Sequence, residues 1–271
     1  MQYISPLYEN LPQVGTNYAS QYASADPFPH IVFHEFFDPK VLTEVADAFP
    51  DLRKNNTHSF NNANEVKLAN NRVHEMPDKV RDFLYYMNSR PVLEFLSNLT
   101  GIQNLIPDPM FIGGGCHEIM RGGLLKIHAD FNTHPHFGLS RRLNLLVYLN
   151  KDWDESYGGH FELWDTEMKG CKVKVLPTFN TMAIFSTTSN SFHGHPDPLN
   201  CPEGRSRRSF ALYYYTNGRP AEEIDPENKE HSTLFVGRNT ENDQHLRGSA
   251  FKRILKDLTP PILIKLARKL R

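Results

Sequence analysis

His128 and Asp130 have the residue types and the spacing that could hold a metal ion. Residues separated by one position point to the same face of a β-strand, so one strand could offer an imidazole nitrogen and a carboxylate oxygen to a single ion. A histidine from a later strand would complete a set of two histidines and one carboxylate on one face of an octahedral ion such as Fe(II). The opposite positions would stay open, and O2 could bind there.

The His-x-Asp spacing alone does not identify a site, because the sequence contains it a second time at 195–197. The flanking residues distinguish the two copies. Residues 124–129 alternate in polarity, which predicts a half-buried strand that ends beside Asp130. Pro196 and Pro198 cannot donate to a sheet ladder, so the second copy predicts a turn.

Short strands are predicted from residue 107 onward. Turn residues, mostly glycine, asparagine and proline, recur about every eight to twelve residues, which is the spacing of an antiparallel barrel or jelly roll. The segments between these turns favour strands at 117–120, 124–129, 143–149, 160–164, 172–176, 181–185, 190–193 and 207–216. These are about eight strands, the number that a jelly roll needs.

Residues 1–105 predict a mostly helical support for this sheet. Residues 26–37 favour one short strand. Asp38 then supplies an N-cap before Pro39, at the start of a helix that reaches about Phe49.

Helical spacing of apolar residues returns over 78–99 and is broken at Pro91, so we expect two further helices that back the sheet. Residues 55–71 contain seven asparagines and little periodicity. This composition predicts a surface loop, with a substrate lid as the alternative.

Several motifs follow one another in a fixed order around these strands. They are Gly122-Gly123, His128-Ala129-Asp130-Phe131, the run from Arg141 to Trp153, Gly158-Gly159 with Phe185, and His193 followed by Arg207-Arg208-Ser209. In this order, over roughly 106–216, the chain resembles the prolyl-4-hydroxylase-like branch of the Fe(II)/2-oxoglutarate-dependent dioxygenases. The resemblance implies a double-stranded β-helix, a bound Fe(II), and 2-oxoglutarate and O2 as cosubstrates. It also implies that an unactivated C–H of a substrate is hydroxylated, with release of succinate and CO2.

The resemblance implies which residues hold the iron. His128 and Asp130 match the first two ligands of the family, and His193 matches the third. His195 lies two residues further along, and on a strand it would share a face with His193, so it remains an alternative third ligand.

The resemblance also implies how 2-oxoglutarate is held. Arg207 matches the basic residue that grips the distal carboxylate, and its planar guanidinium suits a bidentate pair with that group. Its neighbours Arg205 and Arg208 fit the pattern of the family strand less well. Tyr148 matches a tyrosine that hydrogen-bonds the same carboxylate, and packing in the core is the alternative for this residue.

We expect one domain over residues 1–271, mainly β with helices (α+β). Residues 1–105 would be the mostly helical support, 106–220 the jelly-roll core, and 221–271 a C-terminal extension. With 39% hydrophobic and 23% charged residues, a chain of 271 residues can bury a full core.

The composition also bears on compartment and partners. A net charge of -1 at pH 7 gives no overall field for nucleic acid, so none is expected as a partner. The three cysteines are few and lack metal-site spacing, and residues 1–10 carry no secretory signal. We therefore expect a cytoplasmic protein that binds a small-molecule or peptidyl substrate. The sequence specifies no oligomeric state.

The C-terminal extension ends in a basic segment, because residues 247–271 contain eight Lys or Arg and one Asp. Residues 262–270 place apolar side chains on one face, which predicts a basic amphipathic helix. We expect this helix to dock on its own domain. A weak contact with a membrane surface is the alternative.

Three classes of function remain open for this pattern. The leading interpretation is a hydroxylase that acts on a peptidyl proline-like residue or a small biosynthetic intermediate. A non-catalytic jelly-roll binding module and a Zn-dependent hydrolase with the same ligands are the alternatives. Arg207 argues against the binding module, since a scaffold has no need of a buried guanidinium. The sequence offers no evident general base for a hydrolase.

Overall fold

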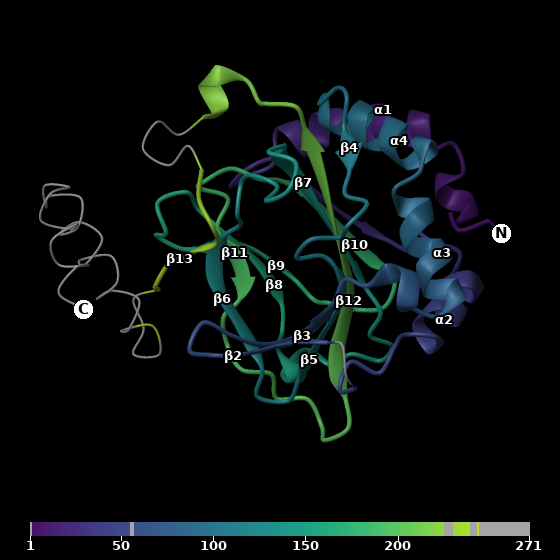
Figure 1. Ribbon diagram of the computed structural model, residues 1–271, viewed down its shortest axis with the longest axis vertical. Helices are drawn as coiled ribbons and strands as arrows, with labels where there is room; N and C mark the ends of the chain where they lie inside the picture. Colours follow the sequence, from purple (N-terminus) through teal and green to yellow (C-terminus); the bar gives the residue numbers. More distant parts are fainter. Residues whose placement is uncertain (1, 55–56, 225–229, 239–242, 244–271) are drawn as a thin grey trace, which may run out of the picture.

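The computed structural model describes residues 2–54, 57–224, 230–238 and 243. A curled antiparallel sheet makes up most of it, and helices pack against one side of that sheet (Figure 1). The basic helix expected within 247–271 lies outside the described residues. Of the helices in the described ranges, none is long and apolar enough to cross a membrane.

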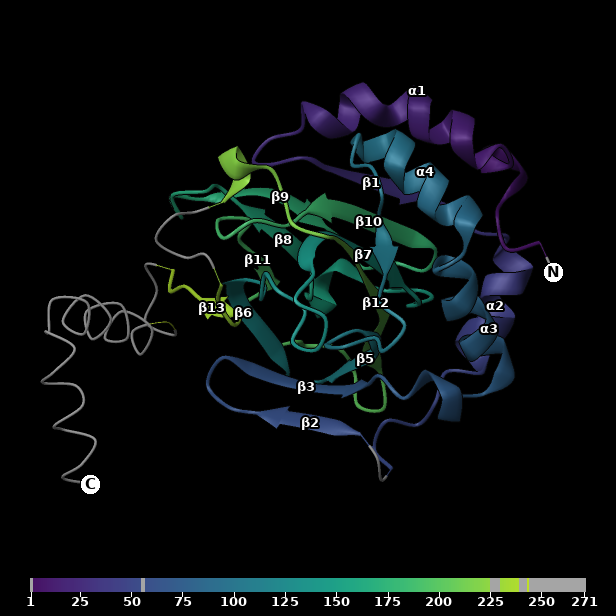
Figure 2. The same cartoon turned by 45° about the horizontal axis from the view of Figure 1, so that its top comes forward.

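Within the described residues, thirteen strands form one sheet, and all pairings between them are antiparallel. The strands are β1 (His30–His34), β2 (His58–Asn61), β3 (Glu65–Asn70), β4 (Ile106–Pro107), β5 (Gly115–Met120), β6 (Leu124–Ala129), β7 (Ser140–Tyr148), β8 (Phe161–Trp164), β9 (Cys171–Val175), β10 (Thr181–Ser186), β11 (His193–His195), β12 (Ser206–Thr216) and β13 (Leu234–Phe235). The main path runs β1-β10-β7-β12-β5-β3-β6-β11-β8-β9. The path curls around an interior, so the predicted jelly-roll core is confirmed (Figure 2).

In the part of the chain that the structure describes, four α-helices cover one face of this sheet. They are α1 (Leu11–Ala23), α2 (Pro39–Asp47), α3 (Asp78–Met87) and α4 (Arg90–Thr100). Helix α1 packs on α4, and α2 packs on α3 (Figure 2). Phe83 and Phe95 from the helices share a core cluster with Leu145, Ile184 and Phe210 from the sheet. Burial of each such side chain stabilises the folded state by about 1.5 to 3 kcal/mol. The two helices predicted over 78–99 therefore form and pack against the sheet, as expected.

Helix α2 begins where the sequence predicts. The Asp38 Oδ1 accepts hydrogen bonds from the backbone N–H groups of Lys40 and Val41, both at 2.9 Å, and Pro39 is the first helical residue. This cap satisfies two donors that the helix itself leaves free. No single element is predicted from the sequence for the residues that form α1.

The prediction of a surface loop at 55–71 is wrong. Strands β2 and β3 form a hairpin there, and β3 also pairs with both β5 and β6. The Asn62 side chain makes the turn, since its Oδ1 accepts from the backbone N–H groups of Asn64 at 2.9 Å and Glu65 at 3.1 Å. The asparagines thus build a turn between strands. The N-terminal region therefore contributes three strands, β1, β2 and β3, as well as helices.

The strand predicted at 190–193 is displaced. The residues before His193 form a turn, in which the Ser191 Oγ accepts from the Thr188 N–H at 2.9 Å and donates to the Thr188 carbonyl oxygen at 3.0 Å. Strand β11 begins only at His193. His195 is therefore the last residue of the strand, so the turn predicted from the second His-x-Asp copy is wrong for His195, and Pro196 is the first residue after the strand.

Candidate metal centre and cosubstrate cavity

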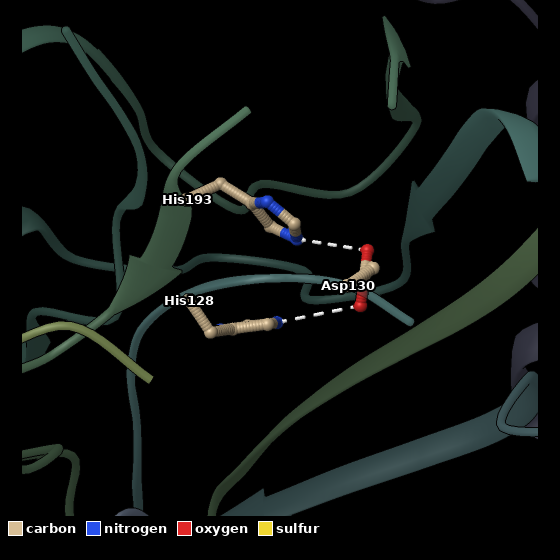
Figure 3. Close-up of side chains that lie close together, drawn as sticks. All are labelled: His128, Asp130 and His193. Atoms are coloured by element: carbon tan, nitrogen blue, oxygen red, sulfur yellow. Dashed lines mark ion pairs between the residues drawn. The ribbon is translucent and has the colours of Figure 1, made fainter. Parts of the chain in front are cut away.

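Three possible metal ligands converge inside the curled sheet. His128 lies on β6, Asp130 follows that strand, and His193 on β11 pairs with His128 across the ladder. The Nε2 atom of His128 is 3.5 Å from Asp130 Oδ1, and the Nε2 atom of His193 is 3.3 Å from Asp130 Oδ2 (Figure 3). One ligand atom from each residue can be chosen so that all three lie within 4.8 Å of one another.

Backbone contacts fix how both imidazoles are protonated. The Nδ1 atom of His128 is 2.7 Å from the Lys126 carbonyl oxygen, and the Nδ1 atom of His193 is 2.9 Å from the Ser191 carbonyl oxygen. A carbonyl oxygen only accepts, so each Nδ1 carries the proton and donates. Each Nε2 then keeps its lone pair on the side of Asp130, as a metal-binding histidine requires.

The Asp130 carboxylate is held by cationic and amide groups. Its Oδ2 accepts hydrogen bonds from Arg141 Nη2 at 3.0 Å and from Asn144 Nδ2 at 2.6 Å. Burial alone would raise the pKa of Asp130, but the charge of Arg141 holds that pKa well below its usual range. The carboxylate is therefore ionised and oriented, the form in which it can bind a metal.

A six-coordinate divalent ion fits this donor set. Octahedral bonds of about 2.1 Å would place neighbouring ligand atoms about 3 Å apart. The nitrogen-to-oxygen distances here, 3.3 and 3.5 Å, are close to that separation. Two imidazoles and one carboxylate with further positions open suit Fe(II). Within the described residues, the structure groups His193 rather than His195 with His128 and Asp130.

Arg207 is a buried cation without an ionic partner among the described residues. Only 5% of this residue is exposed. Its Nε donates to the Gly159 carbonyl oxygen at 2.8 Å, and its Nη2 lies 3.4 Å from the Tyr148 hydroxyl. Burial lowers the pKa of Arg207 and raises the pKa of Tyr148. An arginine side chain is not deprotonated in proteins, so a charged guanidinium lies beside a neutral phenol. A buried charge is costly unless it is paired, so this geometry favours an anionic ligand.

The candidate ligands and Arg207 line one enclosed cavity of about 70 Å³, here called the central cavity. Its other polar lining residues are Lys67, His117, Asn144, His195, Ser209 and Tyr213. Asp130 is the one carboxylate among the described residues that line it. A larger hollow of about 350 Å³, here called the outer pocket, shares His128, Asp130 and Lys67 with it. The β2–β3 hairpin forms one wall of the outer pocket.

The arginines beside Arg207 point elsewhere. Arg205 Nη2 donates to the Lys151 carbonyl oxygen, and Arg208 Nε lies 2.9 Å from Glu118 Oε1. Neither side chain lines the central cavity. Of these three arginines, the structure therefore brings Arg207 alone to the candidate ligands.

The contact between Arg141 and Asp130 could not be predicted from the sequence. This side chain is fully buried, and its guanidinium carbon lies 3.4 Å from the centre of the Tyr213 ring and 4.4 Å from that of Phe131. Its neighbour Arg142 pairs instead with Glu223 at 2.9 Å. Arg141 belongs to the run that carries the family resemblance, but that run does not show which of two adjacent arginines reaches Asp130.

Comparisons with known proteins agree with this geometry. Residues 114–215 match the family model of the 2OG-Fe(II) oxygenase superfamily, in which 2OG stands for 2-oxoglutarate. Prolyl 3-hydroxylase OGFOD1 of Xenopus laevis is 24% identical over 210 residues, in a match that covers 74% of this chain and 37% of that protein. The chain thus spans little more than a third of the length of this curated relative.

Solved structures share the fold. A prolyl hydroxylase from Trichoplax adhaerens, in complex with a hypoxia inducible factor peptide fragment, has a TM-score of 0.57 at 19% identity, covering 77% of this chain and 91% of that one. A Pseudomonas putida prolyl-4-hydroxylase has a TM-score of 0.53 at 15% identity, covering 75% of this chain and 100% of that one. A prolyl 4-hydroxylase from Phytophthora capsici has a TM-score of 0.54 at 18% identity, covering 91% of this chain and 75% of that one.

Proposed function

We propose that this chain, whose residues 114–215 match the family model of the 2OG-Fe(II) oxygenase superfamily, is an Fe(II)- and 2-oxoglutarate-dependent dioxygenase. It hydroxylates a C–H group: one oxygen atom of O2 enters the substrate, and the other enters succinate as 2-oxoglutarate loses CO2. One observation carries the proposal. A His-Asp-His group and a buried guanidinium without an ionic partner among the described residues line the same cavity.

His128, Asp130 and His193 hold the iron in this proposal. The bound ion supplies the redox chemistry that activates O2. The protein supplies two neutral imidazoles, fixed by their backbone contacts, and one ionised carboxylate. Arg141 and Asn144 keep that carboxylate in place whether or not the ion is bound, so the metal site is preorganised.

Arg207 and Tyr148 hold the distal carboxylate of 2-oxoglutarate. The guanidinium supplies the positive charge, and the Tyr148 hydroxyl lies beside it as a further donor. Because both side chains are buried, a carboxylate bound there is shielded from water and its pairing is strengthened. The cosubstrate then extends from Arg207 toward the three metal ligands within the central cavity.

The substrate enters the outer pocket. Its volume of about 350 Å³ suits one amino-acid side chain or a small molecule, and it reaches His128 and Asp130 directly. The hairpin contributes His58, Glu65 and Lys67 to its wall, so this hairpin is placed to select substrates. We propose a peptidyl proline-like residue or a small biosynthetic intermediate, and the similarity to prolyl hydroxylases supports the former.

The proposed enzyme works in a reducing compartment, for which we propose the cytoplasm. Cys116, Cys171 and Cys201 are all free thiols. Reduced cysteines are typical of cytosolic proteins. The same compartment would keep the bound iron in its ferrous state.

The function is tested by turnover of the purified chain. The protein is loaded with Fe(II) without oxygen and then given 2-oxoglutarate, O2 and candidate substrates. We expect succinate to form in step with a substrate product that has gained one oxygen atom. Hydrolysis of a substrate by the Zn(II)-loaded protein, with no succinate from the Fe(II)-loaded protein, would overturn the proposal.

The ligand assignment is tested by metal content. His128→Ala, Asp130→Ala and His193→Ala are expected to lose Fe(II), whereas His195→Ala retains it. The reverse result for His193 and His195 would move the third ligand to His195.

A further inference from the structure

His195 is a buried imidazole that the proposed iron site leaves unused. Only 3% of the residue is exposed, and neither ring nitrogen has a hydrogen-bond partner among the described residues. A polar group buried in this way is unfavourable, and a leucine would fill the same space without that penalty. A partner that is not part of the described chain would account for the imidazole.

The surroundings of His195 indicate the charge of that partner. His195 lines the central cavity together with Arg207 and Lys67. An imidazole carries at least one N–H donor in either protonation state, so His195 offers a donor beside these two cations. Asp130, the carboxylate in this lining, is already engaged by Arg141 and Asn144.

The placement on β11 separates His195 from the metal ligands. It follows His193 by two residues, and the strand register shifts between them, so that His193 pairs with His128 and His195 pairs with Leu125. His195 stays outside the three-residue ligand group within the described chain. The side chain thus lines the cavity that also holds Arg207 without adding to the iron ligands.

A carboxylate at Arg207 has room for further donors. An ionised carboxylate offers about four lone-pair sites, and a bidentate guanidinium fills two of them. The Tyr148 hydroxyl, beside Arg207, can fill a third. An imidazole N–H can fill the fourth.

We propose that His195 donates a hydrogen bond to the distal carboxylate of 2-oxoglutarate, as a third cosubstrate-binding residue beside Arg207 and Tyr148. This inference rests on the proposed function, because it takes 2-oxoglutarate to be the anion in the central cavity. It assigns a binding role to the second histidine of the His-x-His pair on β11.

The test compares two 2-oxo acids that differ only at the distal end. 2-Oxoglutarate has a carboxylate there, and 2-oxopentanoate has a methyl group in its place. Binding of each is measured by calorimetry on the Fe(II)-loaded full chain without oxygen, so that no turnover is needed. The variants are His195→Leu and His195→Gln, and the control is His160→Leu, which changes a partly exposed histidine paired with Glu155. Metal content and melting temperature are recorded for every variant.

We expect His195→Leu to weaken 2-oxoglutarate binding by about tenfold to hundredfold, as for the loss of a hydrogen bond to a charged group. Its affinity for 2-oxopentanoate should stay within about twofold of the wild type. His195→Gln should recover part of the loss because an amide also donates, and it carries the test if His195→Leu does not fold.

Three results would overturn the inference. They are unchanged binding of 2-oxoglutarate by both variants, an equal loss for both 2-oxo acids, and loss of iron from His195→Gln. The last would make His195 a metal ligand. If the iron-loaded wild type does not bind 2-oxoglutarate at all, the proposed function itself fails together with this inference.

Discussion

The two ends of the central cavity differ in how their charges are compensated. At the metal end, the Asp130 carboxylate contacts Arg141, Asn144 and both imidazoles, so anion and cation are matched within the chain. At the opposite end, the Arg207 guanidinium has a carbonyl oxygen and a phenol as its hydrogen-bond partners and no ionic partner among the described residues. One end is electrostatically complete without a ligand, and the other is not.

The difference indicates which parts of the site the chain builds by itself. A metal site needs its ligands held at fixed distances before the ion arrives, and the Arg141 pair does this for Asp130. A cosubstrate that is bound and released in each cycle can supply its own negative charge. The unpaired guanidinium therefore favours ligand binding over stability, which is typical of functional sites.

The largest effect is expected for Asp130→Asn at the complete end. The substitution removes a metal ligand and leaves the fully buried Arg141 without its counterion. Breaking a buried ion pair from one side costs about 3 to 5 kcal/mol. We expect loss of Fe(II) binding together with a fall of that size in the free energy of unfolding, measured by denaturant titration of the metal-free protein.

Asp165→Asn is the matched control, because Asp165 accepts hydrogen bonds in an exposed turn and does not line the central cavity. It should retain iron. A metal-free Asp130→Asn protein as stable as the wild type would show that the pair with Arg141 contributes no stability. The proposed difference in charge compensation between the two ends of the central cavity would then be wrong.

The second largest effect is expected for Arg207→Met at the incomplete end. Removing the partner of a buried carboxylate should weaken 2-oxoglutarate binding by about 2 to 5 kcal/mol and leave iron binding intact. The metal-free protein should lose no stability, because a buried cation without an ionic partner in the described chain is replaced by an apolar side chain. Calorimetry and denaturant titration check the two parts separately.

Arg208→Ala is the control for this variant, since Arg208 lies on the same strand and pairs with Glu118 outside the cavity. It should bind 2-oxoglutarate like the wild type. Equal losses of affinity in the two variants would show that Arg207 is wrongly assigned as the arginine of β12 that faces the cavity.

The sequence predicts the candidate metal ligands better than the residues that hold those ligands in place. The i and i+2 spacing of His128 and Asp130 follows from strand geometry, and the family resemblance supplies His193 and Arg207. The role of Arg141 could not be predicted, because Arg141 and Arg142 are adjacent and alternation alone does not say which faces inward. The choice depends on the pairing of β7 with β12, whose register shifts opposite these residues.

The jelly-roll strands and the helices at 78–99 follow from local patterns, whereas the β2–β3 hairpin does not. Its seven-asparagine segment lacks periodicity, and β3 is stabilised by pairing with β5 and β6, about fifty residues away in sequence. A local pattern does not show such long-range pairing. For the same reason the wall of the outer pocket and the burial of His195 became visible only in the fold.

The smallest effect is expected for Gly159→Ala, which tests how tightly Arg207 is positioned. A Cβ at Gly159 would lie 2.5 Å from Leu199 Cδ2 and 3.0 Å from Arg207 Cδ, at a φ of +74°. At Gly158 the φ is +72°, but a Cβ would meet nothing within 4 Å. Both substitutions carry backbone strain of about 1 to 2 kcal/mol, so Gly158→Ala is a matched control for strain.

We expect both glycine variants to be destabilised by similar amounts and to retain iron, because the metal end does not contact this loop. Only Gly159→Ala should displace the guanidinium and weaken 2-oxoglutarate binding, by about tenfold or about 1.4 kcal/mol. Calorimetry on the iron-loaded variants without oxygen measures the difference. Equal affinities in the two variants would mean that the Arg207 side chain can shift without loss of binding. Bound 2-oxoglutarate would then both orient the guanidinium and neutralise its charge.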